Sequence, residues 1–163
     1  MKKLFKKIIF ISLFMLSASC SIKYIEPIRE GNSVIRFINQ SSVVTIFEDA
    51  TECTGEYGGL PWPELVVKSN KELAFSILTS VGETDSHQYL TCTQMASFVP
   101  KPDTYYTINQ YVPRNSRSCL LEIMQRVPKN DSYHYVPYKP VYIRKRKVTL
   151  FESKAPGCYP LKK

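Results

Sequence analysis

Short runs of alternating apolar and polar residues, separated by proline-rich turns, constrain the fold of this chain more than any other feature. Alternation over five to nine residues is typical of a strand with one buried face. In the runs ELAFSILTS, TYYTINQYV and CLLEIMQRV, the residues predicted to share a buried face are Leu73, Phe75 and Ile77, then Tyr106, Ile108 and Val112, then Leu121, Ile123 and Val127. A weaker run covers residues 141–150.

The turns between these runs favour an all-β fold. The chain has 11 prolines, almost all outside the periodic runs, and proline cannot donate a hydrogen bond to a sheet. Only residues 92–98 allow a helical turn, and the long 3.6-residue periodicity of a helical bundle is missing. We therefore expect an antiparallel two-sheet sandwich or a small barrel of about seven strands, because a single sheet could not bury its apolar face alone.

Two further runs open the predicted sheet. They are VIRFI (residues 34–38) and VVTIFED (residues 43–49), and the polar residues NQSS (39–42) connect them. A polar turn between two runs rich in β-branched residues predicts a hairpin of two paired strands.

The first 19 residues have the composition of an export leader. Four lysines, Lys2, Lys3, Lys6 and Lys7, precede the apolar run IIFISLFML, which ends in small residues. This run is too short to cross the roughly 30 Å hydrocarbon core of a membrane as a helix. The formal charge of +8 owes four units to these lysines, so the remaining 18 basic and 14 acidic residues leave +4. We expect an exported protein without a nucleic-acid partner.

The leader ends in LSASC (residues 16–20), which resembles the lipobox of bacterial lipoproteins. The resemblance implies that Cys20 becomes the mature N-terminus and carries the lipid that holds the protein on the membrane. The same residues also fit cleavage by the ordinary signal peptidase, which leaves a soluble periplasmic or secreted protein as the alternative. The expected organisation is a signal peptide at 1–19, a lipid-anchor tether at 20–32 and a β-sandwich domain at 33–163.

Four cysteines remain when Cys20 is assigned to lipid. An even number in an exported chain predicts disulfides, and spacing alone leaves three connectivities open. We favour Cys92 with Cys119, because they flank one turn and one long strand and can meet across the sheets. Cys53 with Cys158 would then join the two ends of the domain. No cysteine pair has metal-site spacing, and we predict neither a metal nor another cofactor.

Two segments could form a binding surface. Trp62 lies between two prolines and either faces a partner or fills the core. Residues 133–147 interleave tyrosines with basic residues, which would suit sugars or acidic headgroups. The alternative for this segment is an edge strand, which lysine and proline protect against aggregation. The candidate surface residues are Trp62, Tyr138, Tyr142, Arg144, Lys145 and Arg146.

No segment predicts catalysis, so we assign no catalytic residue and expect a non-enzymatic protein. The residues TDSH (84–87) bring an acid, a hydroxyl and His87 together, but neighbours in a loop do not define the geometry of a catalytic triad. An exported hydrolase using His87 or His134 is therefore the weakest hypothesis.

Residues 34–127 resemble a type of small envelope lipoprotein of proteobacteria. The likeness rests on IRFINQSSVVTIFEDATEC and on SFVPKPDTYYTI between two cysteines. It implies an envelope location and a β-sandwich. Because Ser21 rather than aspartate follows Cys20, we expect the lipid at Cys20 to hold the protein on the periplasmic face of the outer membrane. The expected partner is an envelope protein or a glycan. The expected role is structural or binding. An exported inhibitor or ligand-binding module is the alternative, although a net charge of +4 disfavours the binding of basic lysozymes.

Overall fold

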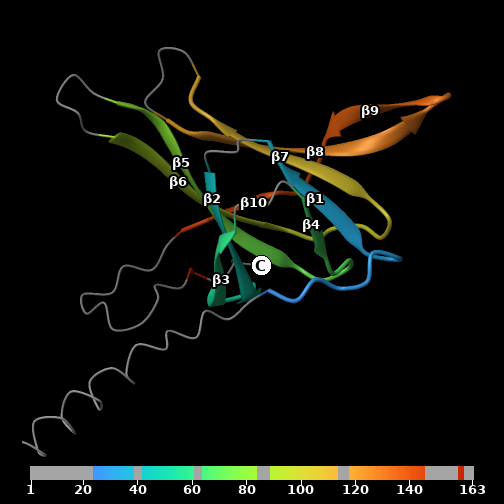
Figure 1. Cartoon of the computed structure of the whole chain (residues 1–163), viewed down its shortest axis with the longest axis horizontal. Helices are drawn as coiled ribbons and strands as arrows, with labels where there is room; N and C mark the ends of the chain where they lie inside the picture. Colours follow the sequence, from blue (N-terminus) through green and yellow to red (C-terminus); the bar gives the residue numbers. More distant parts are fainter. Residues whose placement is uncertain are drawn as a thin grey trace, which may run out of the picture.

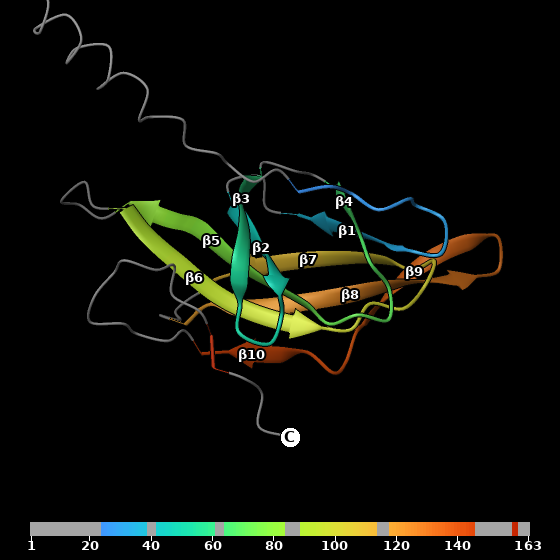
Figure 2. The same ribbon diagram turned by 90° about the horizontal axis from the view of Figure 1, so that it is seen from below.

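The chain forms a sandwich of two five-stranded β-sheets (Figures 1 and 2). The structure is a computed structural model and describes residues 24–38, 42–60, 64–83, 89–113, 118–145 and 158–159. The strands are β1 (Ser33–Phe37), β2 (Ser42–Asp49), β3 (Thr54–Leu60), β4 (Glu64–Val67), β5 (Leu73–Glu83), β6 (Tyr89–Phe98), β7 (Tyr105–Tyr111), β8 (Leu120–Lys129), β9 (Ser132–Pro137) and β10 (Tyr142–Arg144). The predicted all-β sandwich is confirmed, with ten strands rather than about seven.

The strand order is β4-β1-β7-β8-β9 in one sheet, called sheet A here, and β10-β6-β5-β2-β3 in the other, sheet B. The chain passes between the sheets after β1, β3, β4, β6 and β9. Neighbouring strands are antiparallel except β1 and β7, which are parallel. The β8–β9 hairpin extends beyond the rest of the sandwich (Figures 1 and 2).

The predicted hairpin of residues 34–38 and 43–49 is wrong. Both segments are strands, but β1 pairs with β4 and β7 in sheet A, whereas β2 pairs with β3 and β5 in sheet B. The alternation of apolar residues determines which face of a strand is buried, not which strand lies beside it. Residues 92–98, the one segment that allowed a helical turn, lie within strand β6.

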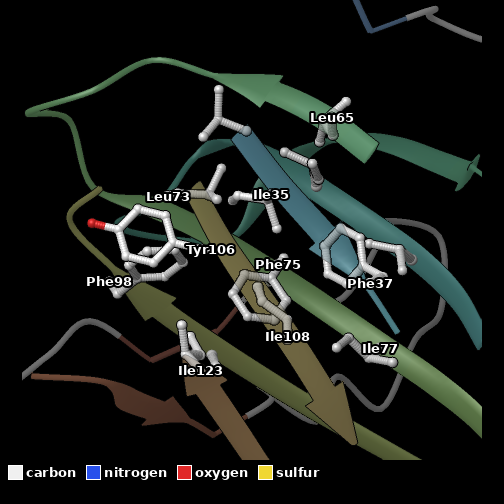
Figure 3. Close-up of a cluster of buried hydrophobic side chains, with 14 of the residues drawn as sticks. Ile35, Phe37, Leu65, Leu73, Phe75, Ile77, Phe98, Tyr106, Ile108 and Ile123 are labelled. Carbon is white, nitrogen blue, oxygen red and sulfur yellow. The ribbon is translucent and has the colours of Figure 1, made fainter. Parts of the chain in front are cut away.

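Aliphatic and aromatic side chains from both sheets fill the core, and the aromatic ones contact one another across it (Figure 3). Phe98 of sheet B contacts Tyr106 of sheet A edge to face, with ring centroids 5.2 Å apart, and Phe75 contacts Phe98 at 6.3 Å. Each of these three side chains is fully buried. The hydroxyl oxygen of Tyr106 accepts a hydrogen bond from the Lys101 backbone N–H at 2.9 Å, so burial leaves no unpaired polar atom there. Burial raises the pKa of Tyr106 to about 12.

Leu73, Phe75 and Ile77 are buried on one face of β5, as their alternation predicts. Tyr106 and Ile108 are likewise buried on one face of β7. The remaining members of the predicted faces are half-buried, except the buried Ile123.

A chain of polar side chains also joins the sheets near one end of the sandwich. Thr79 of sheet B lies 2.5 Å from the Ser42 hydroxyl and donates to Oε1 of Gln110 in sheet A at 2.7 Å. Gln110 donates to Gln94 at 3.2 Å, and Gln94 donates to the Cys119 carbonyl oxygen at 2.8 Å. Buried polar groups are tolerated only when they are hydrogen-bonded, so this chain fixes the relative positions of the strands it joins.

Two disulfides join the cysteine pairs that the sequence favours. Cys92 of β6 bonds to Cys119, which precedes β8, so this bond links sheet B to sheet A. Cys53 follows β2 and bonds to Cys158, 105 residues further along the chain. Persistent disulfides are typical of proteins outside the reducing cytoplasm. Within the described ranges, no helix is long and apolar enough to cross a membrane.

The C-terminal segment should contribute measurably to stability. Deleting residues 155–163 in a Cys53→Ser background removes the long-range disulfide, and we expect the free energy of unfolding to fall by about 2–5 kcal/mol. Urea unfolding of the two chains measures the difference. The full-length Cys53→Ser/Cys158→Ser variant is the control, and it should be the more stable one because it keeps the contacts of Tyr159. A truncated chain as stable as the wild type would contradict this role.

Candidate functional site

The described part of the tyrosine-rich segment, residues 133–145, does not form one surface. The structure divides it between β9 at the edge of sheet A and β10 at the edge of sheet B. This agrees with the edge-strand interpretation of the segment. Of the predicted surface residues, Tyr142 and Lys145 are exposed, while Trp62 and Arg146 lie outside the described residues, as do Cys20 and His87.

The prediction of Tyr138 as a binding-surface residue is wrong, because its side chain belongs to the core. It is 8% exposed, and its ring centroid lies 5.1 Å from that of Tyr106 and 5.5 Å from that of Phe98. Its hydroxyl donates a hydrogen bond to the Val99 carbonyl oxygen at 2.6 Å. Tyrosine is buried where its hydroxyl finds a partner, and the sequence did not reveal this distant carbonyl.

The prediction of Arg144 as a binding-surface residue is also wrong, because the residue is 5% exposed and its guanidinium donates hydrogen bonds within the protein. Its Nη1 pairs with Glu72 Oε1 at 3.0 Å and donates to Ser97 Oγ at 3.2 Å. Its Nη2 donates to the Thr51 carbonyl oxygen at 2.6 Å, and its Nε donates to that of Tyr159 at 3.2 Å. The arginine therefore joins four separate segments beside the outer face of sheet B.

Part of the outer face of sheet B is covered by the end of the chain. Cys158 and Cys53 pack with Phe47, Ala74 and Met95 in a second buried cluster. The Cys158 N–H donates to the Glu52 carbonyl oxygen at 2.6 Å, and the Tyr159 N–H donates to that of Lys145 at 2.9 Å. The outer face of sheet B is thus covered by other parts of the protein at the end near Arg144.

The outer face of sheet A presents aromatic side chains to solvent. We call Tyr105 of β7, Arg126 of β8, and Tyr133 and Tyr135 of β9 the tyrosine–arginine face. The Arg126 guanidinium carbon lies 4.5 Å from the ring centroids of both Tyr105 and Tyr133. Tyr135 lies directly opposite Arg126 in the β8–β9 register. Tyr133 is 63% exposed and Tyr135 is 47% exposed, so two rings of this face remain open to a partner.

Alternation within each strand places these side chains outside. Successive side chains of a strand point to opposite faces, and Tyr106 points into the core, so its neighbour Tyr105 points away from it. Val127 likewise lies on the inner face of β8, so its neighbour Arg126 points outward. The Tyr105 hydroxyl donates to Glu64 Oε1 at 2.7 Å. Partial burial, together with this hydrogen bond, raises the pKa of Tyr105. The hydroxyl therefore stays protonated and holds the ring in place beside Arg126.

A cleft of about 170 Å³ borders the tyrosine–arginine face. Arg29 and Asn32 line it from the segment before β1, Asp103 from the turn before β7, and Tyr105 and Arg126 from the sheet. The cleft is thus formed where strands β1, β7 and β8 lie beside the β6–β7 turn. This cleft could not be predicted from the sequence, because its lining residues are far apart along the chain.

A larger cleft of about 440 Å³ lies between residues 24–27 and sheet B. The Tyr24 hydroxyl donates to the Val66 carbonyl oxygen at 2.9 Å, and its ring meets that of Tyr57 edge to face at 5.4 Å. Burial, and then the nearby Glu26 and Tyr57, raise the pKa of Tyr24 to about 12. The charged lining is mixed, since it includes both lysines and glutamates, so we do not assign a ligand to this cleft.

The described part of the chain shows no group of metal-ligating residues. No three His, Cys, Asp or Glu side chains among the described residues come together as a metal site would require. His134 is exposed on β9, and within the described ranges no hydrogen bond or ion pair joins it to an acid or a hydroxyl.

Comparisons with known proteins give no match. This holds for protein families, for curated sequences and for solved structures. The site must therefore be interpreted from its own geometry.

The network of Arg144 should be essential for stability. Arg144→Met removes the donors for Glu72, Ser97 and two backbone carbonyl oxygens, so we expect a loss on the order of 3 kcal/mol in the free energy of unfolding. Denaturant unfolding measures this loss. Lys145→Met is the matched control, because the neighbouring Lys145 is exposed and its replacement should change stability by less than about 0.5 kcal/mol. Equal effects of the two substitutions would contradict the structural role of Arg144.

Proposed function

We propose that this chain is a non-enzymatic, lipid-anchored envelope protein of the outer membrane that binds an envelope protein or a glycan. The observation that carries the binding role is the tyrosine–arginine face. Arg126 packs on the exposed ring of Tyr133 and lies opposite the exposed Tyr135 in the β8–β9 register. Tyrosine and arginine are among the side chains enriched at binding surfaces. The β8–β9 hairpin, which carries Arg126, Tyr133 and Tyr135, extends beyond the sandwich (Figure 2).

Lipid anchoring is supported by the leader, by the lipobox-like end at Cys20 and by the two disulfides. The position of Tyr24 adds a geometric argument. Tyr24 is packed on the body of the protein and lies four residues after Cys20, and an extended chain of four residues spans at most about 14 Å. A lipid on Cys20 would therefore hold the sandwich close to the membrane surface.

The segment that follows Tyr24 suits such a position. Ile25 is 88% exposed and Ile28 is 82% exposed, although large aliphatic side chains are usually buried. The cleft beside Ile25 has both lysines and glutamates in its lining, so its charge does not favour one kind of headgroup. Exposed apolar side chains close to the anchor favour contact with a lipid surface.

The mature N-terminus tests the proposal. We expect mass spectrometry of the protein from the outer-membrane fraction to find Cys20 as the first residue, with a diacylglycerol thioether and an N-linked acyl chain. The Cys20→Ser variant is the control and should appear without lipid in the soluble periplasmic fraction, because it lacks the thiol that carries the lipid. An unmodified wild-type protein starting at Cys20 or Ser21 would contradict lipid anchoring but would leave export standing.

A further inference from the structure

Two arginines, Arg29 and Arg126, line the small cleft beside the tyrosine–arginine face. Arg29 is exposed and Arg126 is half-buried, and among the described residues neither side chain forms a salt bridge or donates a hydrogen bond. Arg144 differs in this respect, because its guanidinium is paired with four internal groups. The donors of Arg29 and Arg126 are thus available to a ligand, and their charge favours an anionic one.

The guanidinium of Arg126 is held in place before any ligand binds. It stacks on the rings of Tyr105 and Tyr133, each at 4.5 Å, and the Tyr105 ring is fixed by its hydrogen bond to Glu64. Stacking leaves the N–H groups at the edge of the guanidinium free to donate. A side chain that is already ordered loses less entropy on binding, so this geometry favours the capture of a carboxylate or a phosphate.

The other groups at the cleft suit a hydroxyl-bearing ligand. Asp103 Oδ1 accepts the Gly31 N–H at 2.9 Å, and its exposed carboxylate can also accept hydrogen bonds from sugar hydroxyls. The same negative charge disfavours a dense polyanion, because several ligand charges would meet Asp103. Tyr133 does not line the cleft but packs on Arg126 next to it, and the other face of its exposed ring offers a flat surface on which the weakly positive C–H face of a sugar can lie.

The size of the cleft limits how much of a ligand it can hold. About 170 Å³ is smaller than the roughly 300–1,000 Å³ of ordinary small-molecule pockets. One charged group and part of a sugar ring would occupy it, and the rest of the ligand would lie along the open face of sheet A. Such a site would bind a single unit weakly and a repeating polymer more strongly.

From these observations we propose that the cleft binds an acidic saccharide, with its carboxylate or phosphate between Arg29 and Arg126 and a sugar ring against Tyr133. This inference rests on the proposed function, because it specifies the glycan that the tyrosine–arginine face would bind. It assigns the anion to the arginines, the hydroxyl groups to Asp103 and the ring to the tyrosine.

The test is an NMR titration of the full mature chain in detergent micelles with a trimer of galacturonic acid. A neutral galactose trimer, inorganic phosphate and anionic phospholipid vesicles are the comparison probes. We expect the acidic trimer to shift the amide signals of Tyr105, Arg126 and Tyr133 and to bind at least about tenfold more tightly than the neutral trimer or phosphate. Arg29→Gln and Arg126→Gln should each weaken this binding about tenfold.

Lys129→Gln is the matched control, because Lys129 is an exposed cation on the same β8–β9 hairpin and does not line the cleft. It should leave the affinity for the acidic trimer unchanged. Tyr133→Ser should weaken the binding of the acidic trimer more than that of inorganic phosphate. Both ligands lose the stacking that orders Arg126, but only the trimer also loses the ring on which its sugar packs.

Four results would overturn the inference. They are equal binding of the two trimers, an unchanged affinity in Arg126→Gln, phosphate binding as tight as that of the acidic trimer, and arginine-dependent binding of vesicles without binding of the sugar. None of them changes the expected lipid on Cys20. Failure of this inference is therefore distinguishable from failure of the proposed function, which the mature N-terminus tests separately.

Discussion

The contact between Phe98 of sheet B and Tyr106 of sheet A is the interaction on which the rest of the structure depends. It joins the two sheets where β6 ends and β7 begins, and Phe75 and Tyr138 pack around it. Tyr138 lies between β9, at the edge of one sheet, and β10, at the edge of the other, so its buried side chain anchors this crossover to the core.

The two outer faces of the sandwich have different roles as a consequence. The β10 strand carries Arg144 to the outer face of sheet B, where this arginine and the Cys53–Cys158 disulfide hold the C-terminal residues. The outer face of sheet A keeps exposed tyrosines on its last strand. Internal packing therefore accounts for the covered end of one face, whereas the tyrosine rings on the other face remain exposed.

The sequence predicts the strands better than their neighbours. Alternation shows that Leu73, Phe75 and Ile77 point into a core, because the side-chain period of a strand is two residues. It does not show that β1 and β2 belong to different sheets, since a polar segment can serve equally well as a hairpin turn or as a crossover between sheets. The cysteine pairs could be predicted because disulfides require proximity and the nested pairing fits the strand order.

The candidate site was less predictable, because its residues gain their roles from distant partners. Arg144 appears in the sequence as one of several basic residues. In the structure its guanidinium is buried and pairs with the carboxylate of Glu72, 72 residues away. Alternation alone places Tyr105 and Arg126 on the outside of their strands. Their meeting with Tyr133 depends on the register of three strands, which the sequence does not specify.

Peptide mapping under non-reducing conditions tests the central claim, that two separate sheets are fastened together as described. Cys92 lies in sheet B and Cys119 leads into sheet A, whereas Cys53 and Cys158 join the β2–β3 turn to the end of the chain. Proteolysis without reduction, followed by mass spectrometry, should therefore yield linked peptides containing Cys92 with Cys119 and Cys53 with Cys158. Peptides linking Cys53 with Cys92 would contradict both the strand order and the sandwich built on it.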